Sequence, residues 1–274
     1  MQALIDYFGH IPSTHRSAIL IGGITFFWLI EDGWPLFRFS YNKWRHAGVN
    51  VFFTLTTIIV NFAFAFVLVA TSDWAVTNKF GILQWTAFPL WLQAIAGLLL
   101  LDFVGAWLAH FIQHKAKWMW LFHIIHHSDQ HVDTTTANRH HPGESVIRFV
   151  FTTFAILITG APMWLVFLYQ SFSVVLSQFN HANIVLSRPV DTFLRILIVT
   201  PNMHHVHHHY MQPYTDSNYG NIFSIWDRIF GTMQSIDQKN IIYGIDTHLK
   251  SEENSRINNL LLIPFQKYRK PAGK

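Results

Sequence analysis

The chain has 274 residues, of which 51% are hydrophobic and 12% are charged, whereas an ordinary soluble domain has about 25% charged residues, so the composition indicates a membrane protein. Cysteine is absent, which excludes disulfides, thiolate zinc sites, iron–sulfur clusters and covalently attached haem, and leaves nitrogen and oxygen as the ligands for any metal. The formal net charge is +4, but the basic residues are not gathered into one patch, and no nucleic-acid partner is expected.

Two apolar segments near the start of the chain predict membrane spans. Residues 18–30 carry no charge before Glu31 and predict a short first span. A cleaved signal peptide is the alternative, but Arg16 is the only basic residue before the segment and no clear small-residue cleavage site follows it. Residues 49–71 are uncharged over 23 positions, which is long enough to cross a hydrocarbon core of about 30 Å.

The next apolar segment, residues 80–101, predicts a third span. Pro89 suits the first turn of a helix, and the helix can continue through Asp102 to His114. We therefore expect His110 and His114 to emerge at one face of the membrane.

A helical hairpin is predicted in the second half of the chain. Between Arg148 and Arg188 lie 39 uncharged residues, interrupted by Gly160-Ala-Pro162, which is a turn signal. The first arm is short unless its helix begins near Pro142, so the hairpin is expected to be tilted or only partly spanning.

Fourteen of the eighteen histidines lie between His110 and His209, and most have the spacing of one helix face. Because residues three and four positions apart share a face of an α-helix, each run predicts imidazoles that point in one direction. The sets are His110 and His114; His123, His126 and His127; and His204, His207 and His208. In the last run His205, His208 and His209 have the same spacing, so spacing alone leaves two registers open.

Eight convergent imidazoles are too many for one metal ion. Zinc takes three or four protein ligands, so the pattern suits two metals, and imidazole is compatible with iron, copper, zinc and nickel. Soluble di-iron bundles rely largely on glutamate, but Glu144 is the only glutamate between Glu31 and Glu252. The sequence therefore predicts two histidine-held metals, and two iron ions with open positions for oxygen fit this donor number.

Several sequence blocks resemble one known family. They are HFIQH (110–114), WLFHIIHHSDQ (120–130), TANRHHPGE (136–144), TPNMHHVHHHY (200–210) and DSNYGNIFSIWDRIFGT (216–232). Over roughly residues 95–235 the chain resembles the fatty acid hydroxylase/sterol desaturase superfamily of membrane histidine-box di-iron oxygenases. One departure is Phe111, where many members have arginine directly after the first histidine.

The resemblance implies a set of metal ligands. Counted from Thr200-Pro201, the third box falls on His204, and His205 and His209 become bystanders. The family pattern adds a histidine at the end of the fourth span and one in an Arg-x-His-Pro-x-Glu segment. The implied ligands are His110, His114, His123, His126, His127, His204, His207, His208, His181 and His141.

The resemblance also implies an activity, which is O₂-dependent hydroxylation or desaturation of a membrane lipid, fatty-acyl or sterol-like, at a di-iron centre. Zinc is an expected substitute for iron in purified samples. The two electrons must come from a separate donor, ferredoxin-like or a cytochrome or reductase, because the chain has no length for a flavin or haem domain. The alternatives are a bis-histidine haem electron carrier and a divalent-metal transporter; a zinc protease is disfavoured because no His-Glu-x-x-His is present.

The remaining polar candidates receive structural expectations. Asp102, two turns before His110, either orients a ligand imidazole or locks helices together. Asp129 and Asp133 are expected to be solvated loop residues. The histidines outside the boxes are expected at the surface; they are His10, His15, His46 and His248.

The predicted fold class is all-α, an integral membrane protein with about four transmembrane helices and a histidine-rich helical cap. Seventeen of the nineteen Lys and Arg residues lie on the side of the histidines, which predicts a cytoplasmic cap, in a bacterial cell membrane rather than the endoplasmic reticulum. We expect one membrane domain over 1–274, divided into an N-terminal transmembrane hairpin (1–88), a catalytic core (89–235) and a cytoplasmic tail (236–274).

Overall fold

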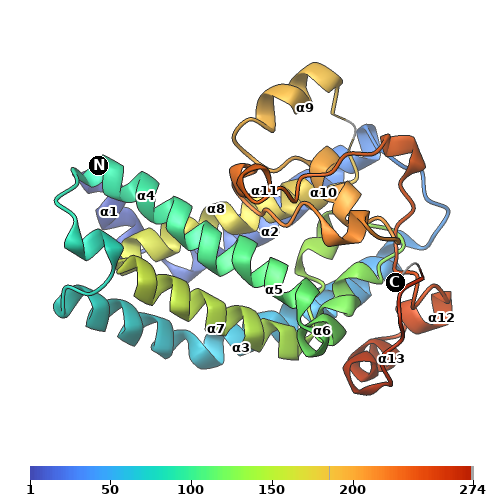
Figure 1. The fold of residues 1–274 in the computed structure, drawn as a ribbon, viewed down its shortest axis with the longest axis horizontal. Helices are drawn as coiled ribbons and strands as arrows, with labels where there is room; N and C mark the ends of the chain where they lie inside the picture. Colours follow the sequence, from blue (N-terminus) through green and yellow to red (C-terminus); the bar gives the residue numbers. More distant parts are fainter. Residues whose placement is uncertain (185, 273–274) are drawn as a thin grey trace.

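The computed structural model describes residues 1–184 and 186–272, and within them the protein is all-helical, as predicted. The longer helices lie along the longest axis of the molecule, and α10, α12 and α13 lie towards one end (Figure 1). The helices of the first two thirds are α1 (Gln2–Gly9), α2 (Ser13–Gly33), α3 (Lys43–Thr77), α4 (Leu90–Asp102), α5 (Ala109–Lys115), α6 (Lys117–His127), α7 (Pro142–Thr159) and α8 (Met163–His181). The later helices are α9 (Arg188–Leu194), α10 (Pro201–His207), α11 (Ile225–Ile229), α12 (Ser251–Asn254) and α13 (Ile257–Leu262).

The hairpin of α7 and α8 forms the centre of the helical bundle. Helix α3 packs on α7, α1 and α2 pack on α8, and α4 packs on both arms. The turn between the arms is where the sequence predicts it: Gly160 ends α7 with φ of 68°, a left-handed conformation that glycine adopts without strain. The backbone at Gly81, with φ of 105°, approaches this turn so closely that a Cβ on Gly81 would lie 2.3 Å from the backbone nitrogen of Gly160.

The helix that begins after Pro89 continues past Asp102 to Lys115, as expected from the sequence. Its middle, Phe103–Leu108, is a π-helical segment that joins α4 to α5. Such wide turns shift the phase of the residues that follow and are frequent near functional sites. This segment therefore sets the direction in which the α5 side chains point.

Among the described residues, three helical segments are long and apolar enough to cross a membrane. They are Lys43–Trp85, Leu90–Lys115 and Pro142–Thr159. The membrane character of the fold is thus supported, while the count of four spans and the sidedness of the cap stay predictions.

Asp102 locks its helix to a distant loop and, among the described residues, hydrogen-bonds no imidazole, so the structural alternative holds. Its buried carboxylate accepts hydrogen bonds from the backbone N–H groups of Ile222 and Phe223, at 3.2 and 3.1 Å, and from Trp226 Nε1 at 3.1 Å. Asp227 holds the same loop, because it accepts the N–H groups of residues 219 and 220. Two buried carboxylates therefore fix the 219–227 segment against the helical bundle.

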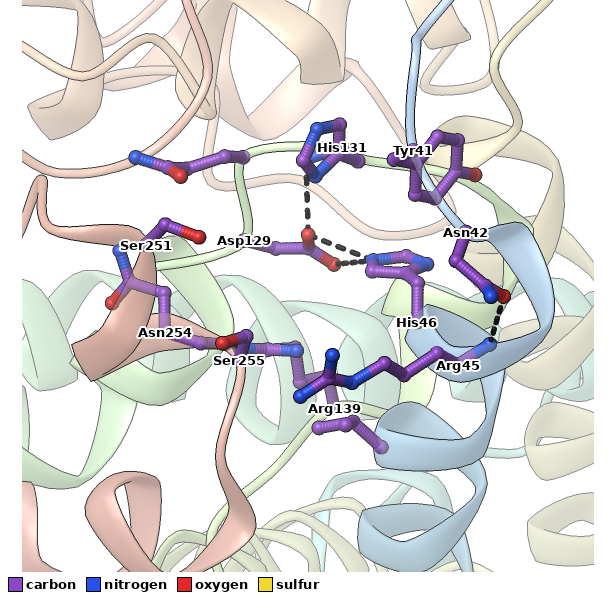
Figure 2. A pocket seen from close by; sticks show the side chains of 12 residues that line it. Tyr41, Asn42, Arg45, His46, Asp129, His131, Arg139, Ser251, Asn254 and Ser255 are labelled. Atoms are coloured by element: carbon purple, nitrogen blue, oxygen red, sulfur yellow. Dashed lines mark hydrogen bonds and ion pairs between the residues drawn. The ribbon is translucent and has the colours of Figure 1, made fainter.

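The expectation that His46, Asp129 and Asp133 are solvated is wrong. His46 Nε2 lies 2.8 Å from Asp129 Oδ1, and both aspartates are buried. Figure 2 shows this pair in the wall of a cavity of about 210 Å³, beside Arg139. Burial alone would raise the pKa of Asp129, but His46 and Arg139 hold it well below its usual range. Residues far apart in sequence thus join in one buried ionic network.

The segment predicted as a cytoplasmic tail is folded within its described part. Leu260 and Ile263 are buried against Ile124 and Ile125 of α6. His248, expected at the surface, is 3% exposed, whereas His10 and His15 are exposed as predicted. The described residues beyond 236 therefore pack against α6 rather than forming a separate tail.

We expect Asp102→Ala to destabilise the protein because three buried N–H donors would lose their acceptor. The expected loss in the free energy of unfolding is about 3 kcal/mol, measured by denaturant or thermal unfolding in detergent. Asp73→Ala, which removes an exposed carboxylate of α3, is the control. Equal stability of the two variants would contradict this role of Asp102.

Candidate metal centre

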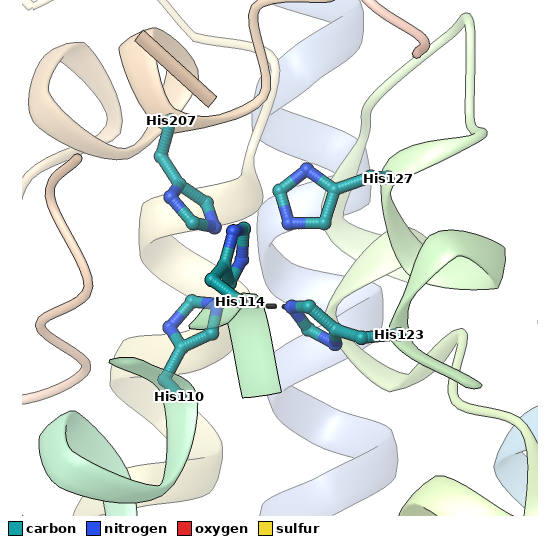
Figure 3. Close-up of side chains that lie close together, drawn as sticks. All are labelled: His110, His114, His123, His127 and His207. Carbon is teal, nitrogen blue, oxygen red and sulfur yellow. Dashed lines mark hydrogen bonds between the residues drawn. The ribbon is translucent and has the colours of Figure 1, made fainter. Parts of the chain in front are cut away.

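Nine buried histidines lie in two groups, and within each group the nitrogen atoms that face one another are no more than 4.8 Å apart. The first histidine group is His110, His114, His123, His127 and His207. The second histidine group is His126, His181, His204 and His208. Figure 3 shows the five rings of the first group turned toward one another. The eight histidines of the predicted boxes and His181 are thus brought together.

Helix boundaries aim these side chains. Helix α5 carries the first box, α6 the second, and α8 ends at His181. Thr200 caps α10 by accepting a hydrogen bond from the backbone N–H of Met203, and Pro201 occupies the first turn. With α10 beginning there, the rings of His204 and His208 join the second group.

Hydrogen bonds at Nδ1 hold several of the rings and fix their protonation. A carbonyl oxygen can only accept a hydrogen bond. A ring whose Nδ1 contacts a carbonyl oxygen therefore carries its proton on Nδ1 and leaves the lone pair of Nε2 free. The Nδ1 atoms of three rings contact carbonyl oxygens, namely His110 with Tyr219 at 2.9 Å, His181 with Ser177 at 2.7 Å and His207 with Ser217 at 2.5 Å. His123 Nδ1 donates to Glu144 Oε1 at 2.8 Å in the same way.

The Nε2 atoms of the two groups are crowded. His110 Nε2 lies 3.0 Å from His123 Nε2, and His181 Nε2 lies 3.0 Å from His204 Nε2. Both rings of the first pair are held at Nδ1, so in their neutral forms a cation between them would satisfy both Nε2 lone pairs. In the described part of the chain, Nε2 also lacks a hydrogen-bond partner in His114, His127, His207 and His208. These orphaned buried nitrogens fit a transition-metal centre.

Burial keeps several of these imidazoles neutral. Removal from water lowers the pKa of His126, His127 and His204 well below the usual value for histidine, and it lowers the pKa of His207 to about 3. A neutral imidazole is the form that binds a metal. The site is therefore ready to coordinate a cation at neutral pH without first losing protons.

His141 is the predicted ligand that lies outside both groups. Its Nδ1 accepts a hydrogen bond from the backbone N–H of Gly143 at 2.9 Å, so the ring caps α7 and is turned toward Phe122. Sequence reasoning overlooked the adjacent His140, whose ring centroid lies 5.1 Å from that of His126. The sequence does contain two adjacent histidines at 140–141, but spacing alone gave no reason to expect His140, rather than His141, beside the second group.

His205 and His209 also lie outside the groups. The His205 ring packs against Tyr243, with a centroid distance of 5.6 Å, and His209 Nδ1 accepts the backbone N–H of Ile242. Both side chains attach the later part of the chain to α10. This arrangement matches the bystander role that the register from Thr200-Pro201 implies.

Glu144 is a supporting residue that sequence reasoning noted only for its rarity. It is fully buried and lies 2.8 Å from His123, 3.7 Å from His140 and 3.9 Å from Arg148. A carboxylate that accepts a hydrogen bond from a ligand imidazole fixes the orientation of the ring and makes its other nitrogen a stronger metal ligand. Its position in the first turn of α7 was visible in the sequence, but its partner on α6 was not.

The model of the fatty acid hydroxylase family matches residues 94–232. An ornithine lipid hydroxylase, OlsE, from Rhizobium tropici is 24% identical over 209 residues, covering 76% of this chain and 60% of the relative. Human alkylglycerol monooxygenase is 31% identical over 173 residues, covering 61% of this chain and 35% of the relative. No solved structure matches.

We expect Glu144→Ala to weaken metal binding about 10- to 100-fold, because His123 would lose the acceptor that orients it. Competition with a chelator of known affinity measures this. Glu31→Gln is the matched control, since Glu31 is also buried but accepts backbone N–H groups of Thr134 and Asn183. A similar loss in both variants would indicate general destabilisation and contradict a specific role for Glu144.

Proposed function

The chain belongs to the fatty acid hydroxylase family, and from this premise we propose that it hydroxylates or desaturates a membrane lipid at two histidine-held iron ions, using O₂. The observation that carries the proposal is the division of nine buried imidazoles into two adjacent groups. A single metal would leave several of these nitrogens without a partner. Burying polar groups without partners is costly, so two metals account for the arrangement better than one.

Each histidine group would hold one iron ion. In the first group the rings of His110, His123 and His207 are held at Nδ1, which leaves Nε2 as the donor. In the second group His181 is held in the same way. Iron supplies, when bound, the capacity to activate O₂ for attack on an unactivated C–H bond. Zinc can replace it in purified samples, because imidazole sites exclude zinc poorly.

A lipid is the proposed substrate, fatty-acyl or sterol-like. One helix that carries the site, Leu90–Lys115, is long and apolar, and a small cavity beside His126, His181 and His204 offers space for the reacting carbon. The names of the relatives also refer to lipids. The chain spans 60% and 35% of the lengths of these two relatives, so their own substrates are not assigned to it.

The proposed source of the two electrons is a separate donor, a ferredoxin-like protein or a cytochrome or reductase. The basic residues near the histidine-bearing ends of the helices include Lys115 and Lys117. A basic face attracts an acidic donor by long-range electrostatics. We place this face on the cytoplasmic side of a bacterial cell membrane.

Metal analysis of the purified protein tests the centre. We expect about two metal ions per chain, and fewer after His127→Ala or His207→Ala, because each removes one ligand of the first group. His205→Ala is the control, since His205 is buried on α10 but lies outside both groups. One metal per chain or none would refute a two-metal centre.

Isotopically labelled dioxygen tests the reaction. With an electron donor and a bacterial lipid extract, we expect one labelled oxygen atom in a product lipid, or loss of two hydrogen atoms if the chain desaturates. Prior removal of the metals with a chelator should abolish the product, and iron should restore it. Mass spectrometry of the lipids is the readout, and product formation that is indifferent to chelation would contradict the proposal.

A further inference from the structure

Two small cavities meet at His140 and Arg148, beside the second histidine group. One borders three histidines of that group, His126, His181 and His204, and also reaches two of the first group. The other lies among α3, α7 and α8 and has a volume of about 140 Å³. His140 and Arg148 line both cavities, so they connect the metal centre to space among the long helices.

The positive charge of Arg148 is weakly compensated. Among the described residues its nearest carboxylate is Glu144, at 3.9 Å, and Glu144 Oε1 is already held by His123 at 2.8 Å. The Arg148 side chain is 30% exposed. A cation on a membrane helix is costly unless paired, and such residues usually mark functional sites. Arg148 therefore has only a long ion pair among the described residues, which leaves its guanidinium able to take a closer anionic partner.

The lining of the second cavity is polar for a site among apolar helices. Ser145 and Thr57 contribute hydroxyl groups, which contact each other at 2.9 Å, and Gln170 of α8 contributes an amide. The guanidinium of arginine presents paired N–H donors that match a carboxylate or phosphate. The cavity thus has the chemistry of a site for an anionic polar head.

An apolar groove lies next to this cavity. It runs between α3 and α7, has a volume of about 670 Å³ and is lined by side chains such as Phe66, Trp74 and Phe154. Phe149 lines both the groove and the polar cavity. An amphiphile can therefore place its head at Arg148 and its hydrocarbon chain in the groove.

We propose that Arg148 anchors the anionic head of the lipid substrate, a phosphate or carboxylate, beside the second histidine group. This inference rests on the proposed function and narrows its substrate class to anionic amphiphiles. Arg148 acts as a positioning residue, because it holds the head rather than the carbon that reacts. The carbons nearest the head then lie closest to His140 and the second group.

Calorimetric titration of the full-length, metal-loaded protein in neutral detergent tests the anchor without turnover. The probes are dodecyl phosphate, dodecanol and inorganic phosphate. We expect Arg148→Gln to weaken dodecyl phosphate binding about 10- to 100-fold, the effect of losing hydrogen bonds to a charged group, and to leave dodecanol binding unchanged. Arg195→Gln is the matched control, because Arg195 also pairs with a carboxylate four residues earlier, at 3.6 Å, and is 38% exposed.

Equal affinity of the parent and Arg148→Gln for dodecyl phosphate would overturn the proposal. Competition by inorganic phosphate as strong as that by dodecyl phosphate would also overturn it, since the hydrocarbon chain would then contribute nothing. If Arg148→Gln fails to fold, Arg148→Lys decides: the ammonium lacks the paired donors, so unchanged affinity overturns the anchor and weaker affinity supports it.

The titration also separates this inference from the proposed function. A chain that binds dodecyl phosphate through Arg148 but oxidises no lipid supports the anchor and contradicts only the proposed reaction. A chain that oxidises lipid while Arg148→Gln binds dodecyl phosphate normally contradicts only the anchor.

Discussion

The structure depends on keeping nine imidazoles buried and aimed at two common points. Where the Nδ1 proton of a ring is fixed, it needs an acceptor, and the acceptors come from three parts of the chain: the 214–219 loop, α7 and, for His181, its own helix α8. Asp227 holds that loop, and Asp102 ties the segment after it to the long helix. The same contacts therefore determine both the stability of the fold and the geometry of the site.

Sequence patterns predicted the features that depend on interactions between residues close together in the chain. The helix from Pro89 to Lys115 and the turn at Gly160 follow from apolar length, proline and glycine. Histidine spacing predicted which rings share a face, because the period of a helix converts sequence distance into direction. The resemblance supplied what spacing left open, since the start of α10 depends on the cap at Thr200.

Contacts between distant segments were not predictable from spacing. His46 and Asp129 are separated by 83 positions, and neither sequence neighbourhood indicates that the two side chains meet. His140 and His141 differ in role because one backbone N–H, that of Gly143, takes the second ring as its cap. Hydropathy likewise identifies apolar length but not the partner on which a helix packs, so the roles of α2 and α8 relative to the membrane did not follow from composition.

The π-helical turn at Phe103–Leu108 also affects how this helix tolerates insertions and deletions. A π turn holds an additional residue without interrupting the helix, so a gain or loss of length can be absorbed there. The apolar half, Leu90–Asp102, can then adapt to bilayers of different thickness, while Ala109–Lys115 keeps its orientation. A change that fits the apolar half to a new membrane then need not disturb the histidines on the other half of the same helix.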